Sequence, residues 1–245
     1  MLGVGGGLII VPALAFSFAY LGFDPSLIMP LALATSLATI IVTSISSIQA
    51  HQKKQAILWS LFKILSPSIL IGAFMGGVFA AQLPSAQLQV IFGFYAILVA
   101  VQLITGKQPS EGSRQLSPFI HSIAGAFIGA ISSVVGIGGG SMTVPYLLWS
   151  SINMRNAVAT SSAIGLPIAI AGAAGYISSS YSLPGLPEYS VGYLYLPAFL
   201  GIIITSYLTA PVGAKLAHQL PITTLKKVFA LLMLGIGLKM LLSVK

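Results

Sequence analysis

Long apolar runs separated by short polar segments make up most of this chain. Of its 245 residues, 56% are hydrophobic and only 6% are charged, whereas a soluble domain has about 25% charged residues. A transmembrane helix needs about 20 apolar residues, so the runs have enough residues for about nine crossings. Because a backbone in lipid must satisfy its own hydrogen bonds, we expect the runs to be helices. The sequence therefore predicts an all-α fold, a polytopic bundle of transmembrane helices.

This composition excludes several classes of protein: a soluble enzyme, a disordered chain, a collagen-like chain and a nucleic-acid-binding domain. The net charge of +8 does not indicate nucleic-acid binding, because the eleven Lys and Arg residues are scattered and form no stripe. The absence of cysteine excludes disulfides, thiol catalysis and thiolate metal sites. No cleavable signal peptide is expected. The runs cover about residues 2–23, 26–49, 57–81, 88–105, 118–135, 141–151, 157–178, 191–217 and 224–243.

An internal repeat divides the chain. The segment GVGGGLIIVP at 3–12 matches GIGGGSMTVP at 136–145, and Ala-Thr-Ser at 34–36 recurs at 159–161. Pro67 matches Pro197, and Gln-Leu-Pro at 82–84 recurs at 219–221. We expect a first repeat at 1–105, a linker at 106–117 and a second repeat at 118–245. The run 118–135 has no counterpart in the first repeat, which we therefore expect to lack one helix.

Basic loops change places between the two repeats. The loop at 51–55 contains two lysines, whereas its equivalent at 181–190 contains no Lys or Arg. The turn at 82–87 is uncharged, whereas its equivalent is flanked by Lys215, His218, Lys226 and Lys227. Since basic loops stay in the cytoplasm, this pattern predicts repeats of opposite orientation and a cytoplasmic linker at 106–117. Inverted repeats are typical of secondary transporters.

The two glycine clusters predict breaks in membrane helices, because each glycine costs about 1 kcal/mol of helix propensity. The run 141–151 is about 16 Å long as a helix and too short to cross, so we expect broken or re-entrant helices at both clusters. A helix that begins inside the membrane presents free N–H groups and the positive end of its dipole, which suit an anion. Close helix packing is the alternative role for these glycines.

Hydroxyl side chains in the repeated Ala-Thr-Ser element are further candidates, either as ligands or as partners of a helix carbonyl. The two prolines after the clusters are expected to end or kink the broken helices. The candidate binding residues are Gly5, Gly6, Gly7, Gly138, Gly139, Gly140, Ser141, Thr35, Ser36, Thr160 and Ser161. The candidate helix-breaking residues are Gly3, Pro12, Gly136 and Pro145.

Ionisable side chains are not expected to take part in the candidate binding site. The only carboxylates, Asp24, Glu111 and Glu188, lie in expected loops, so a carboxylate proton relay or sodium site is not expected. His121, Lys63 and Lys239 lie near the expected ends of their helices, where they can reach the interface. No spacing indicates a metal site, a cofactor or a catalytic centre, and we expect no enzyme activity.

The paired Gly-x-Gly-Gly-Gly-x4-Pro elements, each followed by Ala-Thr-Ser, resemble the TauE/SafE family of sulfite and organosulfur anion exporters. The resemblance covers essentially the whole chain. It implies a multi-pass permease of the cell (inner) membrane that moves sulfite, sulfoacetate or related small sulfur oxyanions. The family's glycine motif falls on Gly3, Gly5, Gly6, Gly7, Gly136, Gly138, Gly139 and Gly140.

The resulting hypothesis is an exporter of a small anion, with the lipid bilayer and that anion as its partners and no nucleic acid. Homo-oligomerisation stays open, as do the substrate, the direction and the coupling ion. A transporter of a metal cation or a neutral solute is the first alternative. A membrane protein without transport activity is the second.

Overall fold

The computed structural model describes residues 6–105, 117–181, 183–219 and 221–243. Nearly all of them are helical, as the apolar runs predict. The elements are α1 Gly7–Tyr20, α2 Pro25–Gln52, α3 Trp59–Ala81, α4 Ser85–Thr105, α5 Pro118–Val134, α6 Gly140–Trp149, α7 Met154–Ser180, β1 Ser190–Val191, β2 Leu194–Tyr195, α8 Leu196–Gln219 and α9 Ile222–Leu242.

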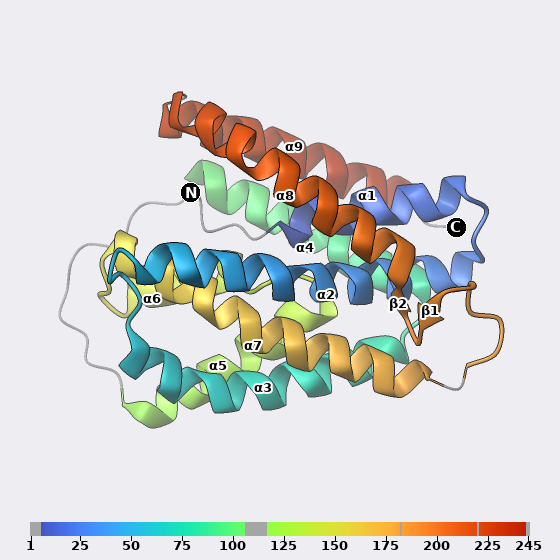
Figure 1. Cartoon of the computed structure of the whole chain (residues 1–245), viewed down its shortest axis with the longest axis horizontal. Helices are drawn as coiled ribbons and strands as arrows, with labels where there is room; N and C mark the ends of the chain where they lie inside the picture. The colour runs from blue at the N-terminus through green and yellow to red at the C-terminus, as the bar shows by residue number, and fades with distance from the viewer. Residues whose placement is uncertain (1–5, 106–116, 182, 220, 244–245) are drawn as a thin grey trace.

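Helices α2 and α7 form the centre of the bundle and lie side by side (Figure 1). In each, 72% of the most apolar 18-residue stretch is buried, against 39% in α3 and 33% in α4. Helix α3 packs on α5 and α7, and α4 packs on α9. In Figure 1, α2 runs from right to left and α7 from left to right, while α1 and α6 lie toward opposite ends. The inverted repeat stays a prediction, and these directions agree with it.

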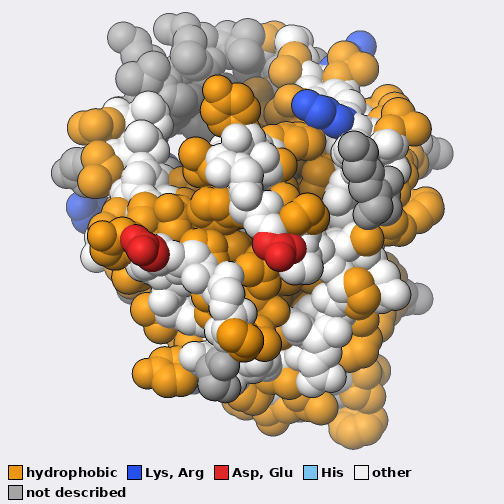
Figure 2. All heavy atoms as spheres, turned by 90° about the vertical axis from the view of Figure 1, so that its right-hand side faces the viewer, with side chains coloured by type: hydrophobic (Ala, Val, Ile, Leu, Met, Phe, Trp, Pro, Cys, Tyr) orange, Lys and Arg blue, Asp and Glu red, His pale blue; other side chains and the backbone are white. Residues whose placement is uncertain are grey.

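The outer surface is apolar, as expected for helices that face lipid. Large side chains such as Met75, Phe79 and Phe94 are exposed. Figure 2 views the end that carries the β1–β2 hairpin, where a few charged groups lie among apolar and uncharged side chains. Four described helices, α2, α3, α4 and α7, are long and apolar enough to cross a membrane, and α1, α5 and residues 196–206 of α8 are shorter apolar segments.

Local capping explains where α2 and α5 begin. Asp24 precedes Pro25 and accepts hydrogen bonds from Ser26 Oγ (2.7 Å) and Ser26 N (2.8 Å). These bonds, with the hydroxyl first, lower the pKa of the Asp24 carboxyl. Ser117 caps α5 in the same way, again directly before a proline. Proline suits the first helical position because its missing N–H would be unpaired there anyway.

The helix break at the second glycine cluster has a defined geometry. Ile137 N donates to Ser132 O (2.9 Å) and Gly136 N to Ser133 O (3.1 Å), and Gly136 has φ +71°. This pair of bonds is a Schellman motif, which needs a left-handed residue and therefore favours glycine. Gly139, also at φ +71°, then precedes α6. Gly136 thus takes part in ending α5, and α6 is a separate helix of only 10 residues.

The prolines of the repeated element do not end their helices, which corrects one of the two roles expected for them. Pro12 lies inside α1 and Pro145 inside α6. Each is the sixth residue of its helix, and Gly7 and Gly140 are the first residues. The glycine and the proline of each copy therefore occupy the same positions in α1 and in α6. A kink at either proline stays a prediction.

Two other details differ from the expectation. The run 191–217 does not begin as a helix, because residues 190–195 form a two-strand hairpin around Gly192, which has φ +55°. Helix α8 therefore starts at Leu196. Pro197 is the second residue of α8, whereas Pro67 lies in the interior of α3. These two prolines are not equivalent, and their match does not belong to the repeat.

Candidate functional site

The structure brings the two glycine clusters into direct contact. A β-carbon on Gly7 would lie 2.6 Å from Gly136 O and 2.9 Å from Ile137 Cα. Only glycine allows this approach of the α1 N-terminus to the break between α5 and α6. Close packing, the alternative role, therefore accounts for Gly7. Gly3 and Gly5 lie outside the described residues.

The N-terminus of α6 follows this contact by four residues, and two of its amides have no acceptor among the described residues. Thr143 N and Met142 N both donate to Gly139 O, at 2.7 Å and 3.1 Å. Within the described part of the chain, the amides of Gly140 and Ser141 have no acceptor. Gly140 and Ser141 are buried. Two buried N–H donors and the positive end of a helix dipole therefore meet here, as an anion site requires.

Two buried hydroxyls lie beside the same helix terminus and have no hydrogen-bond partner among the residues that the structure describes. Ser132 Oγ, on the last turn of α5, and Thr143 Oγ1, on the first turn of α6, belong to fully buried residues. Each lies 3.3 Å from the position of a β-carbon on Gly139. A buried unpaired hydroxyl costs about 1–3 kcal/mol, so this pair is a candidate for binding a polar ligand.

Neither Ser132 nor Thr143 was among the candidates from the sequence. Ser132 lies in an ordinary apolar run, and nothing in the sequence places it next to Gly139. Thr143 could have been found by comparing the two copies of the motif, which read Leu8-Ile9-Ile10 in one and Ser141-Met142-Thr143 in the other. The polar groups at the contact of the clusters thus come from the second copy.

The two threonines of the Ala-Thr-Ser element make reciprocal contacts between the halves. Thr35 Oγ1, on α2, accepts from Tyr195 N (3.1 Å), the residue before α8. Thr160 Oγ1, on α7, accepts from Leu58 N (3.0 Å), the residue before α3. Each threonine thus holds the start of a helix in the other half. This role differs from both alternatives considered for them.

The neighbouring serines have different surroundings. Ser36 Oγ donates to Gly136 O (2.8 Å), which ties α2 to the helix break. Ser161 is buried, and the equivalent carbonyl in the first cluster, that of Gly3, lies outside the described residues. Ser141 Oγ is hydrogen-bonded to Tyr95 OH of α4 (2.7 Å). Of the predicted hydroxyls, the one on Ser141 belongs to the α6 terminus itself.

The remaining glycines of the clusters differ in how closely other atoms surround them. Gly6 precedes α1, is exposed, and its carbonyl accepts from Ile9 N and Ile10 N. A β-carbon on Gly138 would lie 3.0 Å from Ile40 Cγ2 of α2. One on Gly139 would meet the tip of Ile168, a flexible side chain on α7. Gly138 is therefore constrained by packing, whereas Gly139 also lies between the two unpaired hydroxyls.

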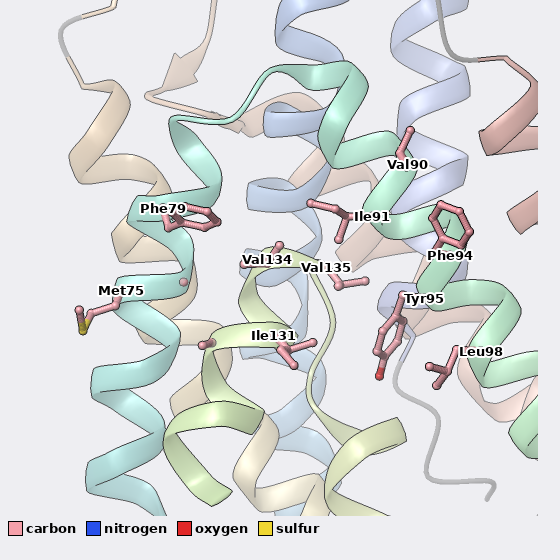
Figure 3. Close-up of a pocket in the computed structure, with 12 residues that line it drawn as sticks. Met75, Phe79, Val90, Ile91, Phe94, Tyr95, Leu98, Ile131, Val134 and Val135 are labelled. Carbon is pink, nitrogen blue, oxygen red and sulfur yellow. The ribbon is translucent and has the colours of Figure 1, made fainter. Parts of the chain in front are cut away.

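An apolar groove of about 780 Å³ opens beside this region, between α3, α4 and α5. Figure 3 shows Met75 and Phe79 on one wall and Phe94, Tyr95 and Leu98 on the other, with Ile131 and Val134 of α5 between them. Its lining is apolar apart from the Tyr95 hydroxyl, which bonds Ser141. The groove offers no charged ligand for an anion, so the candidate site is the α6 terminus.

We expect Thr35→Val and Thr160→Val to lower the free energy of unfolding by about 1–3 kcal/mol each, because each leaves an amide without its acceptor. Anion binding per folded molecule should stay unchanged. Thermal unfolding and ligand binding of the purified variants measure both quantities. Thr43→Val is the matched control, since Thr43 is exposed and bonds only Ile40 O of its own helix. A loss of binding without a loss of stability would instead make these threonines ligands.

The described part of the chain has no group of three or more His, Asp or Glu residues that could hold a metal ion. His121 Nδ1 lies 2.7 Å from Tyr146 OH and joins α5 to α6 near the start of α5. Lys239 Nζ lies 4.1 Å from the centre of the Phe16 ring. Both groups thus have partners within the bundle, and their expected reach to the interface stays a prediction.

An α-helical bundle with several membrane-spanning helices and a helix terminus buried inside it defines a class, the polytopic membrane proteins to which secondary transporters belong. The family described as "Sulfite exporter TauE/SafE" matches residues 1–240. The chain belongs to the TauE/SafE family of membrane transporters.

Curated relatives support this assignment. A "Probable membrane transporter protein" of Haemophilus influenzae is 39% identical over 244 residues, which cover 99% of this chain and 92% of the relative. A protein of Methanocaldococcus jannaschii with the same description is 28% identical over 99% of this chain and 90% of its own length. YdhB of Bacillus subtilis, also described so, is 25% identical over 80% of this chain and 78% of its own length. No solved structure matches.

Proposed function

We propose that this membrane transporter carries a small anion, bound at the N-terminus of α6. The observation that carries the proposal is the coincidence of two free amides, on Gly140 and Ser141, with two buried unpaired hydroxyls, on Ser132 and Thr143. An anion with several oxygen atoms would satisfy all four donors at once. A metal cation would find only hydroxyl and carbonyl oxygens here, and the free amides would repel it.

A sulfur oxyanion or an organosulfonate is the proposed substrate, and sulfite is the first candidate. The description of the matching family names a sulfite exporter, and the site has the donors that a sulfur oxyanion needs. The relatives' descriptions say only that they are membrane transporters. Sulfite as the substrate of this chain is therefore part of the proposal.

The proposed mechanism moves the two halves about the contact of the glycine clusters. The opposite directions of α2 and α7 and the reciprocal bonds of Thr35 and Thr160 support two inverted repeats. In such transporters one repeat rocks against the other around a fixed central site. We place the linker 106–117 in the cytoplasm and the chain in the inner membrane. Export fits this arrangement, because a membrane potential negative inside favours exit of an anion by about 2.3 kcal/mol per charge per 100 mV.

Flux from proteoliposomes tests the proposal. We expect vesicles loaded with sulfite to lose it faster than protein-free vesicles, and faster still when a potential negative inside is imposed. Thiosulfate, sulfoacetate and Ni²⁺ are the comparison solutes. Flux of Ni²⁺ but of no anion would overturn the proposal, and a strict requirement for a sodium gradient would overturn export driven by the potential.

A further inference from the structure

The described side chains nearest to the α6 terminus carry no formal charge. The nearest atoms to the β-carbon positions of Gly138 and Gly139 belong to Ile40, Gly165, Ile168, Ser132 and Thr143. Tyr95, which bonds Ser141, is a neutral phenol at physiological pH. The anion would therefore meet amide and hydroxyl dipoles and no cationic side chain of the described chain.

Charged and titratable side chains on the helices around the site lie far along those helices. His121 precedes Ser132 on α5 by about 16 Å, and His51 follows Ile40 on α2 by about 16 Å, at 1.5 Å per residue. Arg155 precedes Ile168 on α7 by about 20 Å. On α3, Gly76 is level with Ala130 of α5, and Lys63 precedes Gly76 by about 20 Å.

A further described cation, Lys239, contacts α1. Lys239 of α9 lies over the ring of Phe16, and Phe16 follows Gly7 on α1 by about 14 Å. Arg155 in addition donates to Lys54 O (2.8 Å) at the end of the bundle. No described Lys, Arg or His is among the residues nearest to Gly138 and Gly139 or bonded to the Ser141 hydroxyl.

Charge state matters because the site lies in a medium of low dielectric constant. The cost of removing an ion from water grows with the square of its charge, so a dianion costs about four times as much as a monoanion of the same size. Attraction to neutral dipoles grows only in proportion to the charge. Without a cation, the balance therefore favours the singly charged ligand.

From these distances and the four uncharged donors we infer that the site selects singly charged oxyanions and excludes their doubly charged forms. This inference rests on the proposed function and specifies its substrate class. For sulfite the transported species is then hydrogen sulfite. The hydroxyls of Ser132 and Thr143 suit it, because a hydroxyl donates to an ionised oxygen and also accepts from a protonated one.

Transport measured against pH tests the inference in proteoliposomes whose potential is clamped at zero. Sulfite loses its second proton near neutral pH, so its transport should fall by about tenfold per pH unit above that pKa. Methanesulfonate, which stays singly charged, should move at a rate independent of pH, and sulfate should not move above the protein-free rate. Sulfite flux that is constant or rises with pH, together with sulfate flux, would overturn the inference and leave the anion transporter standing. If none of the three anions moves, the proposed function fails as well.

Variants of the two hydroxyls give an independent test. Thr143→Val and Ser132→Ala should each slow methanesulfonate transport by about tenfold or more, the loss expected for one hydrogen bond to a charged ligand. Neither should lower the unfolding temperature, because each removes a buried group that has no partner. Thr43→Val serves again as the control. Unchanged transport in both variants would remove the hydroxyls from the site, and a drop in unfolding temperature would show that they have a structural role instead.

Discussion

Replacing Gly139 with alanine is expected to lower anion transport by more than about a hundredfold while leaving folded protein in the membrane. The added methyl group would displace the tip of Ile168 and would lie 3.3 Å from both Ser132 Oγ and Thr143 Oγ1. An anion bound to these two hydroxyls would compete for the same position. Each hydrogen bond to a charged ligand contributes about 1.5–3 kcal/mol, and 1.4 kcal/mol is a factor of ten. Flux per folded molecule in proteoliposomes measures the loss.

A matched control separates blocked binding from backbone strain. Gly139 has φ +71°, and any other residue there costs about 1–2 kcal/mol. Gly22, between α1 and α2, has φ +76° and nothing within 4 Å of its β-carbon position. Gly22→Ala therefore adds the same strain without filling a site, and its transport should stay normal. Equal losses in the two variants would mean that strain, and not a ligand, explains the effect at Gly139.

Replacing Gly72 with valine is expected to have the largest effect on stability. A β-carbon at Gly72 would overlap the backbone of Ala126, lying 2.8 Å from its Cα and 2.7 Å from its carbonyl carbon. On the facing helix, a β-carbon at Gly129 would lie 2.5 Å from Ile69 O. Glycines therefore let α3 and α5 pack backbone to backbone, as small residues do in membrane helices. A backbone cannot move aside as a flexible side chain can. We therefore expect the free energy of unfolding to fall by about 3 kcal/mol or more.

Chemical or thermal unfolding in detergent measures this loss, and the yield of monodisperse protein should fall with it. The control is Gly201→Ala on α8, where nothing lies within 4 Å of the β-carbon position. Alanine there should be neutral or stabilise the helix by up to about 1 kcal/mol. A Gly72 variant as stable as the Gly201 variant would contradict the close packing of α3 on α5.

The sequence predicted the helix break and the short α6 because both follow from local chemistry. Four glycines in five residues cannot continue a helix cheaply, and the turn at Gly136 needs a left-handed residue. The same pattern could not separate packing from binding. That distinction depends on what lies opposite each glycine, which is backbone at Gly7 and the Ile168 side chain with two hydroxyls at Gly139.

Contacts between the halves could not be predicted, because they join residues far apart in the chain. Thr35 and Tyr195 are neighbours only after α2 and the β1–β2 hairpin meet. Ser132 was overlooked for the same reason, since its position beside Gly139 depends on the turn that reverses the chain. Periodicity and composition describe one helix at a time and carry no information about contacts between distant segments.

The position of a bound anion tests the central claim most directly. Selenite is the selenium analogue of sulfite, and its anomalous scattering would locate it in crystals of the protein. We predict one strong peak within hydrogen-bonding distance of the amides of Gly140 and Ser141 and of the hydroxyls of Ser132 and Thr143. A peak beside Lys63 or Lys239, with none at the start of α6, would contradict the account.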